Sequence, residues 1–123
     1  MIRFTISPDP IEIPFQQDKL EGVTLKFKTS GFSLAYKLNE VQIEIKGKPG
    51  EEPLLKATEK LDRTIPVVPF VTKDIKLDDI SLGAIEDFYN EAFYDSLKSE
   101  TYTLSITVTG TKTSSATATV KFK

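Results

Sequence analysis

The chain has 123 residues, of which 39% are hydrophobic and 28% charged. That length suits one domain with its own core, so residues 1–123 are predicted to form a single domain. Cysteine and histidine are both absent, which excludes disulfides, thiol chemistry and the commonest general base and metal ligand. The 16 basic and 18 acidic residues give a net charge of −2. This balance indicates neither nucleic acid nor any strongly charged partner.

The N-terminal residues predict a sheet edge rather than a targeting signal. The first apolar residues are interrupted by Pro8 before a signal-peptide core can form, and no run of about 18 apolar residues follows anywhere. Pro8, Pro10 and Pro14 bracket Ile11 and Ile13. Because proline cannot donate to a strand ladder, this pattern is typical of a guarded edge. We expect a cytoplasmic protein without a membrane span.

The middle of the chain predicts further strands. Residues 23–28 alternate between apolar and polar side chains, which indicates a half-buried strand. Residues 32–46 carry two such patterns in opposite phase, so a bulge or tight turn is expected at Asn39-Glu40. Residues 54–61 are ambiguous. Residues 64–71 are β-branched but contain two prolines, which predicts an edge strand or a strand that switches sheets.

One helix is expected at about residues 82–98, because apolar residues recur there at helical spacing. Ser81, or Asp78 and Asp79 before it, would cap its start. Tyr94 falls outside the stripe and is expected to be exposed or to contact a neighbour. The predicted stripe consists of Ile85, Phe88, Tyr89, Ala92, Phe93 and Leu97.

The C-terminal residues give the clearest strand signal. Residues 102–109 alternate strictly, residues 110–115 form a turn sequence, and residues 116–122 alternate again. This arrangement predicts a long antiparallel hairpin with one buried face and one threonine-rich face.

These elements favour a mainly β fold, namely an antiparallel β-sandwich of the immunoglobulin or fibronectin III type. We expect seven or eight short strands, with the helix near residues 82–98 inserted to cover an open end or edge. A five-stranded oligonucleotide-binding barrel, which also carries a helix, ranks second because the strand count favours the sandwich and the interleaving of basic and aromatic residues is weak.

Charge is distributed unevenly along the chain. Residues 1–73 carry 11 basic and 10 acidic groups, residues 74–100 carry 2 and 8, and residues 101–123 carry 3 and none. Asp87, Glu91 and Asp95 are spaced by four residues and would therefore share one face of the predicted helix. This face could be solvated, or it could bind a hard cation such as calcium. Because the calcium-loop pattern is absent, the solvated face is favoured. The basic hairpin could meet an anionic partner, although threonine commonly serves strand propensity alone. The candidate interaction surface comprises Asp87, Glu91, Asp95, Tyr94, Lys112 and Lys121.

Catalysis is not predicted. No serine or threonine stands in a nucleophile motif, no glycine-rich phosphate loop occurs, and no sequence feature selects one pair among the 18 acids for glycoside hydrolysis. We therefore expect no enzyme, no cofactor, no metal site and no small-molecule substrate.

Five short stretches, with a helix between the third and fourth, follow one another in a characteristic order: residues 22–28, 38–45, 63–71, 102–110 and 118–122. This order of elements resembles the LEA14-type domain, also called the water stress and hypersensitive response (WHy) domain. The resemblance covers about residues 20–123 and rests on patterning and short stretches. It implies a non-enzymatic β-sandwich with a helix, linked to desiccation and stress protection. The Asn-Pro-Asn signature expected after the first core strand is replaced by residues 29–32, so no functional residue is carried over.

Together these features predict a non-catalytic protein that protects, scaffolds or binds another macromolecule, with stress protection as its most specific form. A protein partner or self-association fits this prediction. The alternative is a structural subunit of a filament, surface layer or virion, built through edge strands or a donated strand. The 14 lysines and the scarcity of thermolabile side chains are typical of heat-adapted proteins.

Overall fold

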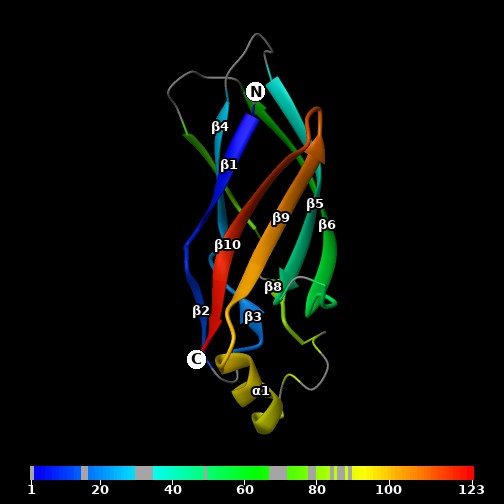
Figure 1. Ribbon diagram of the computed structural model, residues 1–123. Helices are drawn as coiled ribbons and strands as arrows, with labels where there is room; N and C mark the ends of the chain where they lie inside the picture. Colours follow the sequence, from blue (N-terminus) through cyan, green and yellow to red (C-terminus); the bar gives the residue numbers. More distant parts are fainter. Residues whose placement is uncertain are drawn as a thin grey trace.

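A computed structural model describes residues 2–14, 17–29, 35–48, 50–66, 72–77, 80–83, 85, 88 and 90–123. The fold is mainly β with one short helix, as the sequence predicts (Figure 1). The described residues form more strands than the seven or eight expected. The elements are β1 (Ile2–Ser7), β2 (Ile11–Ile13), β3 (Lys19–Leu20), β4 (Thr24–Thr29), β5 (Ala35–Lys46), β6 (Leu55–Pro66), β7 (Thr72–Lys76), β8 (Ile80–Ser81), α1 (Glu91–Lys98), β9 (Tyr102–Gly110) and β10 (Ser114–Phe122).

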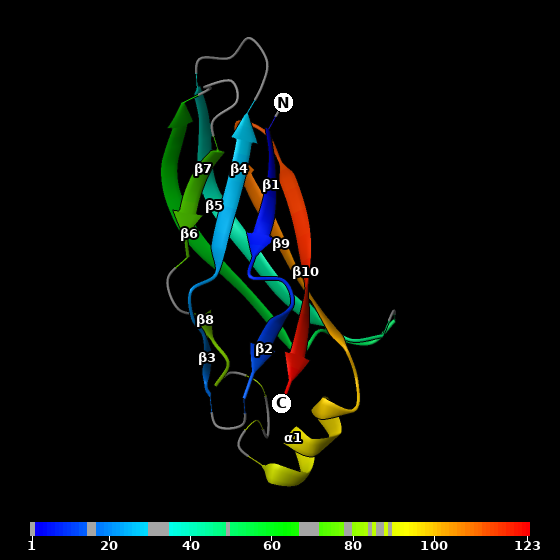
Figure 2. The same cartoon turned by 90° about the vertical axis from the view of Figure 1, so that its left-hand side faces the viewer.

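The strands form a three-stranded sheet of order β1-β4-β7, a five-stranded sheet of order β2-β10-β9-β5-β6, and a small β3-β8 pair. Every pairing is antiparallel except β2 with β10, which is parallel. Figure 2 shows β1 and β4 in front of the more strongly curved five-stranded sheet. Alternate residues of both sheets, such as Phe4, Leu25, Ile43 and Ile106, are buried in one shared core. That core couples the two larger sheets into one unit.

Two strand predictions are confirmed in detail. The hairpin pairs β9 with β10 in register from Tyr102 opposite Val120 to Val108 opposite Ser114. In β5 the register shifts between Leu38 and Glu40, at the predicted position. Leu38 and Val41 are consequently both buried although three positions separate them. The bulge therefore lets the apolar residues before and after it face the same core, although their alternation is out of phase.

The predicted N-terminal edge is also confirmed. After β1 the chain passes through Pro8 and Pro10 and leaves the three-stranded sheet to pair, as β2, at the edge of the five-stranded sheet. The Asp9 carboxylate accepts a hydrogen bond of 3.0 Å from the Thr119 main-chain N–H, just before the β2–β10 pairing begins at Val120. Asp9 therefore supplies the acceptor that a β-strand would otherwise provide at this position.

Replacing Asp9 with alanine should lower the free energy of unfolding by about 1 kcal/mol, because a hydrogen bond to an ionised acceptor is lost. Urea unfolding at pH 7 measures this change. Glu12, exposed on the neighbouring β2, provides the matched control, since its ion pair with Lys123 lies at the surface. Glu12→Ala should cost less than Asp9→Ala, and equal costs would contradict the assigned role of Asp9.

Strand β6 forms the other edge of the five-stranded sheet, and the ambiguous segment is strand from residue 55 onward. Residues 64–66 end this edge strand, and residues 67–71 lie outside the described part of the chain. Glu59 lies opposite the fully buried Val41, so it points to the core side of the edge. Asp62 has a positive φ of 46° and interrupts the regular strand. An inward charge and an irregular backbone both hinder pairing with another strand.

The helix prediction is confirmed over residues 91–98 but was wrong in its start and in part of its buried face; Tyr89 lies outside the described residues. The helix begins at Glu91 with Asn90 as its N-cap, whose side chain accepts a 3.0 Å hydrogen bond from the Phe93 N–H. Ile85 and Phe88 are buried as predicted, but the Ile85 N–H donates to Leu82 and the Phe88 N–H to Ile85, which are turns across three residues. The helix buries Tyr94 and Leu97, whereas Phe93 is half-buried and Ala92 is exposed. Asn90 competes well for the cap because asparagine is among the preferred N-cap residues.

Candidate interaction surfaces

The predicted acidic surface lies partly on α1, at one end of the molecule (Figure 1). Glu91 and Asp95 are exposed on this helix, and Asp95 pairs with Lys98 at 3.2 Å. Asp87 lies outside the described residues. Because the helix begins at Glu91, it holds two of the three acids expected on one face. Within the described ranges no group of three acidic residues is placed to hold a metal ion.

The predicted basic residues do not form one surface with these acids. Lys112 lies in the turn between β9 and β10, at the end of the molecule opposite α1. Lys121 is exposed on β10, opposite Glu12 of β2. Lys123 forms a 2.7 Å ion pair with Glu12. The basic C-terminal residues are thus divided between the two ends of the molecule.

Tyr94 requires a correction, because it is fully buried and not part of an exposed surface. Its hydroxyl donates to the main-chain oxygen of Ile13 at 2.5 Å and lies 3.2 Å from that of Lys123. Its ring meets those of Phe88 and Phe122 edge to face, each with centroids 5.8 Å apart. Burial raises the pKa of Tyr94 above the usual tyrosine value. Tyr94 thus ties the helix to the ends of β2 and β10.

The outward face of the β9–β10 hairpin presents rows of hydroxyl groups. Thr107 and Ser115 face each other across the strands with their side-chain oxygens 3.0 Å apart. On the other side of β9, the outward neighbours from β5 include Glu40 and Glu44, opposite Thr109 and Ser105. Lys46 lies opposite Thr103 in the same row, and Lys121 follows Thr119 on the same side of β10. This surface is therefore hydroxyl-rich with both acidic and basic neighbours, not uniformly basic as the hairpin sequence suggests. We call it the hydroxyl face; it comprises Thr103, Ser105, Thr107, Thr109, Ser115, Thr117 and Thr119.

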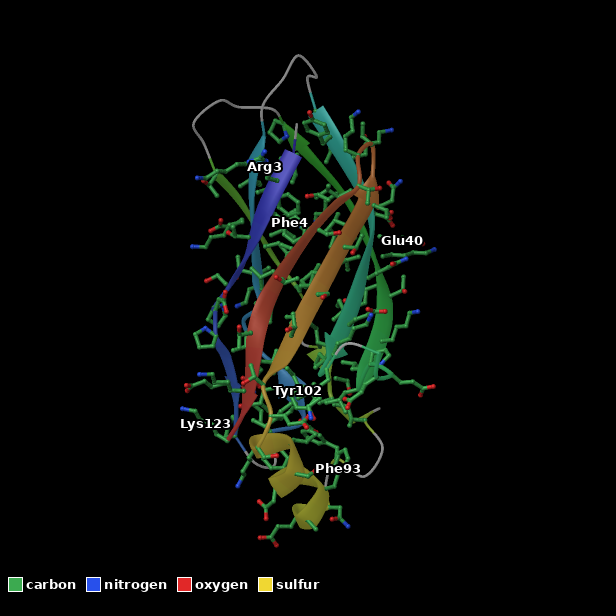
Figure 3. The ribbon with its side chains drawn as sticks, in the orientation of Figure 1. Arg3, Phe4, Glu40, Phe93, Tyr102 and Lys123 are labelled. Atoms are coloured by element: carbon green, nitrogen blue, oxygen red, sulfur yellow. The ribbon has the colours of Figure 1, made fainter. Side chains whose placement is uncertain are left out.

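The outer face of the three-stranded sheet carries a second surface that the sequence did not single out. Strand pairing places Arg3 opposite Lys28 and Lys28 opposite Thr72 in one row, and Thr5, Lys26 and Asp74 in the next. Phe4 and Phe27 point the other way and pack together with ring centroids 5.0 Å apart. Figure 3 shows Arg3 and Phe4 on β1, far from α1. The strand alternation thus separates a buried aromatic side from an exposed cationic side.

This cationic surface is hollowed. A hollow of about 420 Å³ opens over it, which is within the size range of small-ligand sites. Strand alternation in residues 23–28 already indicates that Lys26 and Lys28 share a face. Arg3 joins them only through the pairing of β1 with β4, which no local sequence signal specifies. We call this site the cationic hollow; it is lined by Arg3, Phe4, Thr5, Lys26, Lys28 and Thr72.

No family model matches the chain, and no curated protein matches it at a significant level. In the described part of the chain, no helix is both long and apolar enough to span a bilayer.

Proposed function

We propose that this protein is a non-catalytic β-sandwich that binds other macromolecules and protects them during water loss. The hydroxyl face is the observation that carries the proposal. The resemblance to the LEA14-type domain supports the same function, since it implies stress protection.

The chemistry of the hydroxyl face suits a protective contact. Each threonine or serine hydroxyl both donates and accepts hydrogen bonds, so it can replace water against many polar surfaces without requiring a particular charge. Alternating residues of β9, such as Leu104, Ile106 and Val108, are buried below this face and hold it in place. The face is therefore a fixed array of hydroxyls on a packed sheet, well suited to a broad range of clients.

The two edges of the five-stranded sheet favour this function over the alternative, a subunit of a filament, surface layer or virion. β2 is three residues long and is flanked by prolines, and β6 carries the inward Glu59 and the irregular Asp62. Such features hinder edge-to-edge association. A protective protein benefits from them because its own concentration rises on drying.

A drying assay tests the proposal. A labile enzyme is dried and rehydrated with the wild-type protein or with the triple variant Thr103→Ala, Thr107→Ala and Thr117→Ala. We expect wild-type protein to preserve activity beyond an inert carrier protein, and the triple variant to lose about half of that benefit because three hydroxyls are removed. The matched control is Thr5→Ala, Thr24→Ala and Thr72→Ala, which removes three hydroxyls from the other sheet and should protect as the wild type does.

Three results would count against the proposal. If the wild-type protein preserves no more enzyme activity than the carrier protein does, the proposed function is wrong. If both triple variants lose the same share of this protection, the hydroxyl face has no special role in it. Sedimentation of the wild-type protein as a concentration-dependent polymer would favour the structural-subunit alternative. Urea unfolding of both triple variants checks that neither result reflects loss of the fold.

A further inference from the structure

The cationic hollow has no part in the function proposed above, yet its charge calls for an explanation. Four basic side chains point outward from the three-stranded sheet, namely Arg3, Lys26, Lys28 and Lys76, with Asp74 as the acidic one among the described outward residues. We propose that the cationic hollow binds a soluble oligophosphate, meaning a ligand that carries two or more linked phosphate groups.

The strand register supplies the first argument. Arg3 and Lys28 lie directly opposite each other on β1 and β4. Like charges in this position destabilise a sheet. Among the ion pairs of the described residues, none involves Arg3, Lys26 or Lys28. An anion held between these side chains would turn their mutual repulsion into attraction for the ligand.

The spacing of the cations supplies the second argument. Arg3 and Lys28 are separated by one strand spacing of about 5 Å, and Lys26 follows Lys28 at about 7 Å along the strand. Two linked phosphates can therefore contact different cations at once. The arginine fork can bind one phosphate through two hydrogen bonds, and the lysines can neutralise the next.

The size and lining of the hollow supply the third argument. Its 420 Å³ equals the volume of roughly 14 water molecules, which exceeds what a single phosphate fills. The hydroxyls of Thr5 and Thr72 lie at its rim and can donate to phosphate oxygens. Below it, the buried Phe4 packs on Phe27 and forms an apolar layer under the site. A ligand with several phosphates therefore fits this site better than orthophosphate does.

Isothermal titration calorimetry at low salt tests the proposal with tripolyphosphate, orthophosphate, ATP and adenosine. We expect tripolyphosphate to bind at least about tenfold more tightly than orthophosphate, since a second charge-assisted contact forms. ATP binding as tightly as tripolyphosphate identifies the phosphate chain alone as the ligand. Tighter binding of ATP identifies a nucleotide as its source. Binding of orthophosphate or adenosine as tight as that of tripolyphosphate and ATP would overturn the proposal.

Two double variants that remove the same positive charge at different places distinguish binding at the cationic hollow from general electrostatic attraction to the protein. The double variant Arg3→Gln and Lys28→Gln should weaken tripolyphosphate binding about 100-fold, because two charged contacts are lost. Lys112→Gln with Lys121→Gln removes the same charge elsewhere and should leave the affinity within about twofold. Arg3→Lys keeps the charge but loses the fork, and should weaken binding by an intermediate factor. Equal losses in the two double variants would overturn the site. These results are independent of the drying assay.

Discussion

Replacing Tyr94 with alanine is expected to lower the free energy of unfolding by about 3–5 kcal/mol, as large aromatic truncations in cores do. Tyr94 is fully buried between Phe88 and Phe122, and its hydroxyl holds the ends of β2 and β10 together. The substitution removes both the ring contacts and this link. Urea unfolding at pH 7 measures the loss. Phe93→Ala, one position earlier and half-buried, should cost clearly less.

Tyr94→Phe separates the hydroxyl from the ring. The Ile13 oxygen still accepts a 2.8 Å hydrogen bond from the Lys123 N–H, so this change should cost about 1 kcal/mol at pH 7. Burial raises the pKa of Tyr94 in the folded protein, and the unfolded tyrosine therefore ionises first. The contribution of Tyr94 to the free energy of unfolding is therefore complete below about pH 10 and declines as the pH rises further. The wild-type protein should thus lose more stability than Tyr94→Phe in this alkaline range, and parallel losses would contradict the assignment.

Gly110→Ala is expected to cost at least about 3 kcal/mol. A Cβ at this position would collide with the main-chain oxygen of Lys37 and would lie 2.8 Å from its carbonyl carbon and 3.0 Å from the Leu38 Cα. Overpacking costs about 1–3 kcal/mol where side chains can move, but here the obstructing atoms belong to the main chain. The bulged β5 approaches β9 closely at this point, and the Lys37 oxygen accepts a 3.0 Å hydrogen bond from the Thr111 N–H.

Urea unfolding and amide hydrogen exchange measure the effect of Gly110→Ala. Exchange should accelerate first at the N–H groups of Lys37 and Thr111, which bond across the bulge. Thr109→Ala, the preceding residue on β9, is the control and should stay within about 1 kcal/mol of wild type. A Gly110→Ala variant as stable as Thr109→Ala would show that β5 and β9 can separate here without disturbing the core.

Strand prediction succeeded where the signal is local. Alternation along residues 102–109 and 116–122 identifies buried faces because successive strand residues point to opposite sides. The phase change at Asn39-Glu40 located the bulge for the same reason. The helix start failed because Ile85 and Phe88, although at helical spacing, are buried through turns that the spacing cannot distinguish from a helix. Asn90 carried the signal that would have corrected it.

The candidate surfaces depended more on tertiary structure. Glu91 and Lys112 are separated to opposite ends of the molecule, and Tyr94 is buried because the helix packs against the ends of β2 and β10. The exposure of a helical residue depends on which side the neighbouring strands cover, and the covering strands come from distant parts of the chain. For this reason the stripe predicted from hydrophobic spacing alone did not include Tyr94.

By itself the sequence determined a mainly β fold, its hairpin, its bulge and its proline-guarded N-terminal edge, all properties that depend on residues close together in the chain. Tertiary structure alone decided that Arg3 faces Lys28 and that Asp9 completes the ladder at Thr119. These partners are far apart in sequence, and strand order rather than local pattern brings them together. The even overall charge therefore concealed a concentrated cationic surface that only sheet pairing assembles.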